Sequence, residues 1–278
     1  MLFTTRPVGD AMATTIWGAS SSWTLTALPL FVWMGEILFR TKLSENLFEG
    51  LSPWMQKLPG GLIHVNVIGC ALFAAISGSS AATVATVGKM SIPELRKRKY
   101  PENILLGSLA GSGTLGLLIP PSIILIIYGV TVQESIAKLF IAGILPGIMI
   151  ALIFMAYVMI WSIINKKSMP IFYKNYSFTE KVRKSGKLLP VILLIISVIG
   201  SIYTGIATAT EAASLGVVGA LVLSYFQKSL TIKTFKESLL GATKTSCMIA
   251  FILAGATFLS LAMGFTGLPR NLAIWIQS

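Results

Sequence analysis

Long apolar stretches alternate with short basic segments along this chain of 278 residues. A helix needs about 20 mainly apolar residues to cross a bilayer, and the pattern predicts spans at residues 23–39, 139–164, 188–203, 207–226 and 239–265. Basic segments follow residues 39, 88, 164 and 226. Because Lys and Arg concentrate in cytoplasmic loops, we expect all four on the cytoplasmic side. The pattern predicts an all-α polytopic membrane protein.

Two further apolar stretches are interrupted. Residues 62–88 contain a small polar run at 76–80, and neither flanking arm is long enough to cross a bilayer comfortably. We therefore expect a re-entrant hairpin with both ends on one side, which also lets all four basic segments share that side. Residues 104–130 are broken by Gly113-Thr114-Leu115-Gly116 and by Pro120-Pro121, and we expect a helical arm on each side of this break.

The two interruptions indicate a polar site near the middle of the membrane. An unsatisfied backbone group in lipid costs several kcal/mol, so broken helices persist only where protein or a water-filled cavity surrounds them. Freed carbonyls then face cations, and half-helix N-termini face anions. The small residues at 77–80 are, by themselves, as typical of close helix packing as of a site. The nearby Pro120-Pro121 break favours the site.

Composition narrows the class of function. Hydrophobic residues make up 54% of the chain and charged residues 12%, which excludes a soluble enzyme. The net charge of +12 lies between the apolar stretches rather than on an aromatic and basic surface, so we expect no nucleic-acid partner. One His and few intramembrane acids give no catalytic constellation, so we expect no enzyme. Cys70 and Cys247 lack metal-ligand spacing, and we expect both to be buried thiols.

Three ionisable residues in or beside the apolar stretches have two interpretations each. Glu36 is either a buried functional carboxylate or a solvated group near the headgroups. Glu211 is either functional or part of a helix start, and His64 more often marks a helix end than a ligand. Because none of them indicates a proton relay, the freed carbonyls and hydroxyls at 77–80 are the candidate ligands for a cation. The neighbouring half-helix N-termini are the candidate site for an anion.

Two segments differ from the spans. Apolar residues recur at helical spacing over 43–58, which predicts an amphipathic helix that Pro53 kinks and Pro59-Gly60-Gly61 ends. Residues 165–187 are rich in Lys and Arg, which predicts a cytoplasmic loop near anionic headgroups.

Ordered motifs occur along most of the chain. They are Ala27-Leu28-Pro29-Leu30-Phe31 with Gly35-Glu36; Pro59-Gly60-Gly61; Ile76-Ser77-Gly78-Ser79; Ile119-Pro120-Pro121-Ser122 with Tyr128-Gly129; Phe140-Ile141-Ala142-Gly143-Ile144-Leu145-Pro146-Gly147; and Thr208-Ala209-Thr210-Glu211-Ala212-Ala213. Together they resemble the large membrane subunit of the tripartite ATP-independent periplasmic (TRAP) transporters, the DctM-type permeases.

The resemblance implies an elevator-type secondary transporter built from inverted repeats. It implies import of small organic acids, such as C4-dicarboxylates or sialic acid, with sodium as the coupling ion and no other cofactor. The implied partners are a small four-helix membrane subunit, a periplasmic substrate-binding protein, the organic acid and the lipid bilayer. The implied location is the cytoplasmic (inner) membrane of a bacterium or archaeon.

The resemblance also assigns site residues, because the family's first hairpin and following broken helix form one sodium site and half of the substrate site. The implied sodium-binding residues are Ser77, Gly78, Ser79, Gly113, Thr114 and Gly116. The implied substrate-binding residues are Ser79, Ser80, Ser112, Pro120, Pro121 and Ser122. We expect sodium to order the tip at 77–80 and so to favour substrate binding.

We expect three regions along the chain. Residues 1–61 are a scaffold of one span and an amphipathic arm helix, 62–138 are a transport domain of hairpin and broken helix, and 139–278 are scaffold spans and the start of a second repeat. Two family spans before Trp23, and a second hairpin and second break after Gly267, are not recognised, so we expect a fragment or truncated product. Two alternatives stay open: another sodium-coupled elevator family of organic-anion transporters, and a non-transporting membrane scaffold.

Overall fold

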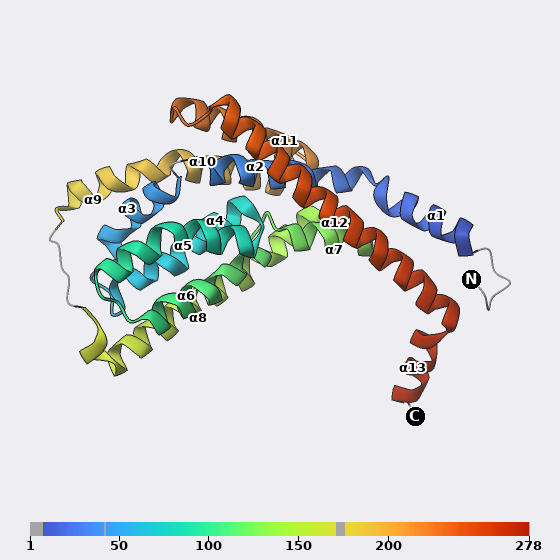
Figure 1. Cartoon of the computed structure of the whole chain (residues 1–278), viewed down its shortest axis with the longest axis horizontal. Helices are drawn as coiled ribbons and strands as arrows, with labels where there is room; N and C mark the ends of the chain where they lie inside the picture. The colour runs from blue at the N-terminus through green and yellow to red at the C-terminus, as the bar shows by residue number, and fades with distance from the viewer. Residues whose placement is uncertain (1–7, 42, 171–175, 278) are drawn as a thin grey trace.

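The computed structural model describes residues 8–41, 43–170 and 176–277, which form helices and turns but no strands. Figure 1 shows most helices side by side in one bundle, with α1, the end of α12 and α13 extending from it. The helices in chain order are α1 (Val8–Ser20), α2 (Ala27–Phe39), α3 (Leu43–Met55), α4 (His64–Ser77), α5 (Ser80–Lys97), α6 (Glu102–Gly113), α7 (Ile123–Val132), α8 (Ile136–Ile164), α9 (Phe178–Ser185), α10 (Leu189–Tyr203), α11 (Ala209–Phe226), α12 (Ile232–Thr266) and α13 (Leu268–Gln277). Short 3-10 turns lie between some of them, among them η1 (Trp23–Thr26) and η3 (Thr114–Leu117).

Four helical segments in the described part of the chain are long and apolar enough to cross a membrane. They are α8, the stretch Phe178–Tyr203 that contains α9 and α10, α11 and α12. The spans predicted at 139–164, 188–203, 207–226 and 239–265 are therefore confirmed by length and composition. The described residues form an all-α polytopic membrane protein.

The span predicted at 23–39 needs correction. Trp23–Thr26 is a 3-10 turn, and α2 itself has 13 residues, which is too short to cross a bilayer. The segment reaches the length of a span only together with Gly9–Gly18, across a bend of 57°. Ser20, Ser21 and Ser22 lie at this bend, where hydroxyl side chains compete with helical backbone hydrogen bonds.

Helix α2 lies at the centre of the packing. It packs on α4, α11 and α12, and its Leu28, Phe31 and Leu38 side chains are almost completely buried. Phe31 meets Phe140 of α8 edge to face, with ring centroids 6.0 Å apart. This core joins the early helices to the C-terminal ones.

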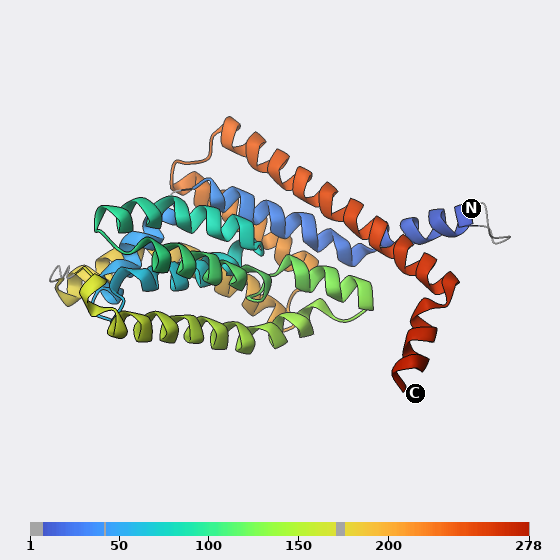
Figure 2. The same cartoon turned by 60° about the horizontal axis from the view of Figure 1, so that its bottom comes forward.

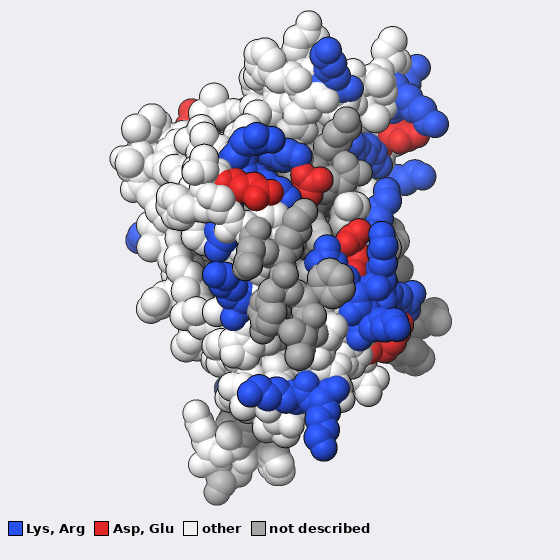
Figure 3. All heavy atoms as spheres, turned by 90° about the vertical axis from the view of Figure 1, so that its left-hand side faces the viewer, with Lys and Arg blue, Asp and Glu red and all other residues white. Residues whose placement is uncertain are grey.

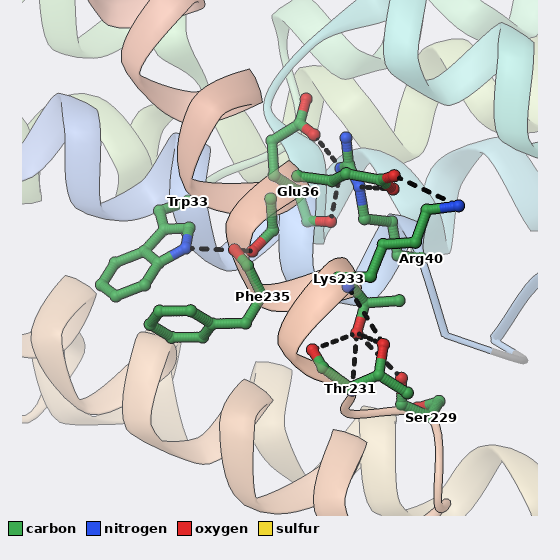
Figure 4. Close-up of polar contacts among 10 residues, drawn as sticks. Trp33, Glu36, Arg40, Ser229, Thr231, Lys233 and Phe235 are labelled. Atoms are coloured by element: carbon green, nitrogen blue, oxygen red, sulfur yellow. Dashed lines mark hydrogen bonds and ion pairs between the residues drawn. The ribbon is translucent and has the colours of Figure 1, made fainter.

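Polar contacts join α2 and the residue that follows it to the first turns of α12 (Figure 4). Trp33 Nε1 donates to Ser238 Oγ at 3.3 Å. Glu36 pairs with Arg40 one turn later, and Arg40 Nε lies 3.9 Å from Glu237 Oε2. Glu36 is therefore engaged in an ion-pair group near the C-terminal end of α2.

The basic segments meet at one end of the bundle, which we call the basic end. The end of α2, the turn between α5 and α6, the end of α8 and the turn between α11 and α12 all lie on the left in Figure 1. Figure 3 shows Lys and Arg gathered over this face. Across the α5–α6 turn, Arg96 Nε lies 2.7 Å from Glu102 Oε1, and this hydrogen bond raises the pKa of the guanidinium. One shared end is what the charge pattern predicts.

Helix α3 is the predicted amphipathic segment, and it lies against α9 at the basic end. It is helical through Pro53. Trp54 Nε1 donates to Ser185 Oγ at 2.8 Å, and Lys187 Nζ lies 2.5 Å from Glu49 Oε2. The prediction of a loop over the whole of 165–187 is therefore wrong, because these contacts with α3 hold α9 as a helix. Residues 171–175 lie outside the described residues.

The two cysteines differ in burial. Cys70 is buried in α4, as predicted, whereas Cys247 is exposed on α12. The prediction for Cys247 is wrong because α12 buries few of its residues within this chain.

Candidate functional site

The interruption at 76–80 is the tip of a helical hairpin. Helix α4 ends at Ser77, Gly78 adopts a left-handed conformation (φ 58°), and extended Ser79 is the N-cap of α5. Helices α4 and α5 pack on one another, and Figures 1 and 2 show both arms running from the tip to the basic end. The predicted helical hairpin is present, and α5 continues through Pro93 to Lys97, beyond the apolar stretch. Its re-entrant placement in the membrane stays a prediction.

Three oxygen atoms form a triangle just below the tip. Ser77 Oγ lies 2.9 Å from Thr83 Oγ1 and 3.3 Å from the Ser79 carbonyl oxygen. Thr83 Oγ1 donates to the same carbonyl at 2.7 Å. Sequence reasoning missed Thr83, which is completely buried. Its position four residues after Ser79 is the signal that could have identified it, because a hydroxyl in a helix commonly donates to the carbonyl one turn earlier.

The second interruption separates α6 from α7. It consists of η3, an irregular stretch with a cis peptide bond between Pro120 and Pro121, and Ser122 as the N-cap of α7. Ser122 Oγ donates to the Leu117 carbonyl oxygen at 2.5 Å and accepts from the amide of Leu125 at 3.5 Å. The predicted broken helix with an arm on each side is confirmed.

The hairpin tip and the break touch each other. The Ile123 amide donates to the Gly78 carbonyl oxygen at 3.3 Å. A Cβ at Gly78 would lie 2.6 Å from the Pro121 carbonyl oxygen, and a Cβ at Gly116 would lie 2.8 Å from the Ser79 carbonyl carbon. Only glycine permits so close an approach of backbone to backbone.

Other small residues complete the enclosure of the hairpin. Gly35 of α2 approaches Ser77, since a Cβ there would lie 3.0 Å from the Ser77 Cα. Gly113 at the end of α6 faces Val84 of α5, with no room for a side chain. Of the candidate residues, the structure brings Ser77, Gly78, Ser79, Ser80, Gly113, Gly116 and Pro121 to this contact.

The other candidate residues lie around the contact rather than in it. Ser112 is buried against α4, where its Oγ donates to the Ser108 carbonyl oxygen at 2.5 Å. Thr114 is exposed, and its Oγ1 donates to the Gly111 carbonyl oxygen at 2.7 Å. Pro120 faces Gly143 of α8, and Ser122 caps α7. No hydrogen bond within the described chain joins the Ser112 or Thr114 hydroxyl to the tip, and the roles of all these residues stay predictions.

Asn66 is a buried polar residue to which sequence reasoning gave no role. Its Nδ2 donates to Ser108 Oγ at 3.0 Å and to the Leu105 carbonyl oxygen at 3.3 Å, which joins α4 to α6. Its Oδ1 has no hydrogen-bond partner within the described residues. The sequence signal that could have identified Asn66 is a single side-chain amide within an otherwise apolar helical arm.

The structure places both His64 and Glu211 at helix starts. His64 begins α4, and its Nε2 lies 2.7 Å from the Pro59 carbonyl oxygen. Glu211 accepts from the Thr208 amide at 2.8 Å, and its own amide donates to Thr208 Oγ1, which together form a capping box at the start of α11. Both residues therefore mark helix starts.

The contact between the hairpin tip and the break contains groups suited to binding an anion and groups suited to binding a cation. Helices α5 and α7 both begin here. The Ala82 and Leu125 amides donate to the N-cap hydroxyls and the Ile123 amide to Gly78, and the positive ends of the two helix dipoles favour an anion. The oxygen triangle offers hard ligands of the kind that bind alkali cations. Among the described residues, no group of His, Cys, Asp or Glu is arranged to hold a metal ion. Paired helix breaks inside a bundle of apolar helices are typical of the transporter class of membrane proteins.

Comparison with known proteins identifies the family. The family model described as "Tripartite ATP-independent periplasmic transporter, DctM component" matches residues 1–278, and the chain belongs to this family. It is 33% identical over 96% of its length to the C4-dicarboxylate TRAP transporter large permease protein DctM of Pseudomonas aeruginosa. It is 32% identical over 92% of its length to the sialic acid TRAP transporter large permease protein SiaM of Vibrio cholerae. It is also 32% identical over 96% of its length to the 2,3-diketo-L-gulonate TRAP transporter large permease protein YiaN of Escherichia coli.

The chain spans about three-fifths of these relatives, covering 62%, 60% and 62% of them respectively. The names describe transporter permeases rather than enzymes. The resemblance inferred from the motifs is therefore confirmed at the level of the family.

Proposed function

We propose that this chain forms part of the membrane permease of a sodium-coupled, binding-protein-dependent secondary transporter that imports small organic acids. The observation that carries the proposal is the direct contact between the hairpin tip and the break, with the Ile123 amide on the Gly78 carbonyl oxygen. A cation site and an anion site that share this contact are coupled whenever one ligand orders the backbone that the other ligand needs.

In the proposed mechanism, sodium binds first at the tip. Ser77 Oγ, the Ser79 carbonyl oxygen and Thr83 Oγ1 are its nearest ligands in this chain, and Gly78, Gly113 and Gly116 hold the backbone close. The ion fixes Ser79 and Ser80 at the start of α5. A substrate carboxylate then binds at the N-termini of α5 and α7, where backbone amides and the helix dipoles favour negative charge.

The relatives support a small organic acid as the substrate class. Their names include a C4-dicarboxylate, sialic acid and 2,3-diketo-L-gulonate, which share a carboxylate. The word tripartite in the family description supports two partners, a small membrane subunit and a periplasmic substrate-binding protein. We propose that the basic end faces the cytoplasm and that residues 62–138 move as a transport domain against a scaffold formed by the flanking regions.

The test uses the permease complex in proteoliposomes with a radiolabelled C4-dicarboxylate and the binding protein. We expect uptake to need an inward sodium gradient and to be lost in Ser77→Ala, which removes one oxygen of the triangle. Ser197→Ala is the matched control, because the Ser197 hydroxyl donates only within α10, to the Leu194 carbonyl oxygen at 2.8 Å. Uptake driven equally well by a potassium gradient would remove sodium from the proposal. No uptake of any organic acid would favour a non-transporting scaffold.

A further inference from the structure

A cavity lies at the basic end, at the other end of the hairpin arms from the tip. It has a volume of about 810 Å³. Its walls are residues 56–61 before α4, Tyr100 before α6, and the end of α8 with the residues that follow. It is therefore separate from the contact between tip and break.

The charges around this cavity are all positive. Lys57, Lys166 and Lys167 line it, and no Asp or Glu does. None of these lysines forms an ion pair with a carboxylate in the described part of the chain. Three exposed lysines from two separate segments thus line one space in which no carboxylate takes part, which favours an anion.

The cavity also has a buried neutral donor. Ser162 lines it and is 4% exposed, yet its hydroxyl has no hydrogen-bond partner within the described residues. A buried hydroxyl without a partner costs free energy unless a ligand or water satisfies it. Gly60 lies directly beside it, since a Cβ there would be 3.1 Å from Ser162 Oγ. The donor is held where the turn before α4 meets α8.

The outer side of the cavity is apolar and continues along α8. Ile163 lines the cavity and is exposed, and Leu152 and Ile160 on the same helix are exposed as well. Only 17% of the most apolar part of α8 is buried within the chain. A ligand with a phosphate group in the cavity and hydrocarbon along α8 would satisfy both surfaces, which free phosphate would not.

We propose that this cavity binds the headgroup of an anionic phospholipid. The phosphate diester lies between Lys57, Lys166 and Lys167 and accepts a hydrogen bond from Ser162, and an acyl chain follows the exposed face of α8. Basic pockets between membrane helices at the cytoplasmic surface are suited to such headgroups.

The experiment measures lipid binding to the purified full chain by native mass spectrometry, with phosphatidylglycerol and phosphatidylcholine of identical acyl chains. We expect one phosphatidylglycerol per chain to be retained in preference to phosphatidylcholine. The double variant Lys166→Gln/Lys167→Gln should weaken phosphatidylglycerol binding by about twenty-fivefold, because each basic residue near the membrane surface contributes a factor of about five. Ser162→Ala, which keeps the net charge, should weaken it by about threefold to fivefold.

The matched control is Lys233→Gln/Lys236→Gln, which removes the same charge from the first turns of α12, outside the cavity. We expect this variant to bind phosphatidylglycerol as the unaltered chain does. An equal loss in the control, or no loss in the cavity variants, would overturn the proposal. So would displacement of the lipid by millimolar inorganic phosphate, since that result would identify a free anion as the ligand.

Discussion

The contact between Gly116 and the hairpin tip makes Gly116→Ala the most informative substitution. A Cβ at this position would lie 2.8 Å from the Ser79 carbonyl carbon and 2.9 Å from both the Ser79 oxygen and the Ser80 nitrogen. These are backbone atoms, so no side-chain rotation relieves the overlap. The tip must move away from the break by a few tenths of an ångström, or η3 must move instead.

The size of the effect follows from this geometry. Inserting a methyl group into a well-packed site costs about 1–3 kcal/mol. A value of about 2 kcal/mol would make the closed contact about thirtyfold less populated relative to a separated one. If the contact forms the coupled site, sodium-driven uptake should fall by a similar factor, and the thermal midpoint of the purified chain should fall by a few degrees.

Gly107→Ala is the control for Gly116→Ala. Gly107 also lies in the α6–η3 segment, but a Cβ there meets nothing within 4 Å. This control should leave uptake unchanged and keep or slightly raise the thermal midpoint, because Ala favours a helix over Gly by up to about 1 kcal/mol. Equal thermal midpoints and equal uptake for the two variants would refute the tight contact and the mechanism built on it.

Three other substitutions test separate features. Thr83→Val should raise the sodium concentration for half-maximal uptake at least fivefold, and Thr83→Ser should restore it; an unchanged sodium dependence in Thr83→Val would remove this hydroxyl from the site. Thr208→Ala removes the N-cap of α11 and should lower stability by about 1 kcal/mol, seen as a lower thermal midpoint; an unchanged midpoint would contradict the capping box. Arg40→Gln breaks the pair with Glu36, and because partly exposed ion pairs contribute at most about 1 kcal/mol and are screened, its midpoint should approach that of the unaltered chain at high salt. A difference that does not depend on salt would point to packing instead.

The interruptions of the helices could be predicted because single residues cause them. Gly78 provides the left-handed conformation that ends α4, and Pro120-Pro121 cannot continue a helix. The contribution of Thr83 could not be predicted in the same way. It lies inside a regular helical arm, and its hydroxyl reaches Ser77 only because the chain reverses at Gly78.

Helix ends in the polar region were predicted less well than the apolar centres. The span predicted from residue 239 is part of a helix that starts at Ile232, because Thr231 and Thr234 cap it. Because its first turns contain charged residues, hydropathy alone predicts a loop there. Charged residues do not end a helix, however, where the helix extends beyond the hydrocarbon layer. Conversely, Ser20, Ser21 and Ser22 separate α1 from η1 and α2. Because no uninterrupted apolar run covers these elements, the sequence did not indicate that they form one bent segment.

The length of α12 sets how it must sit in a bilayer. Its 35 residues, at about 1.5 Å each, extend about 52 Å, whereas the hydrocarbon layer is about 30 Å thick. An upright α12 would therefore carry roughly four turns beyond the hydrocarbon. Figure 1 shows it crossing the bundle obliquely, and inclination shortens the extent of a long helix along the bilayer normal. Lipids beside α12 thus contact an inclined helix, whereas lipids beside α8 contact a helix that runs roughly parallel to the other helices of the bundle.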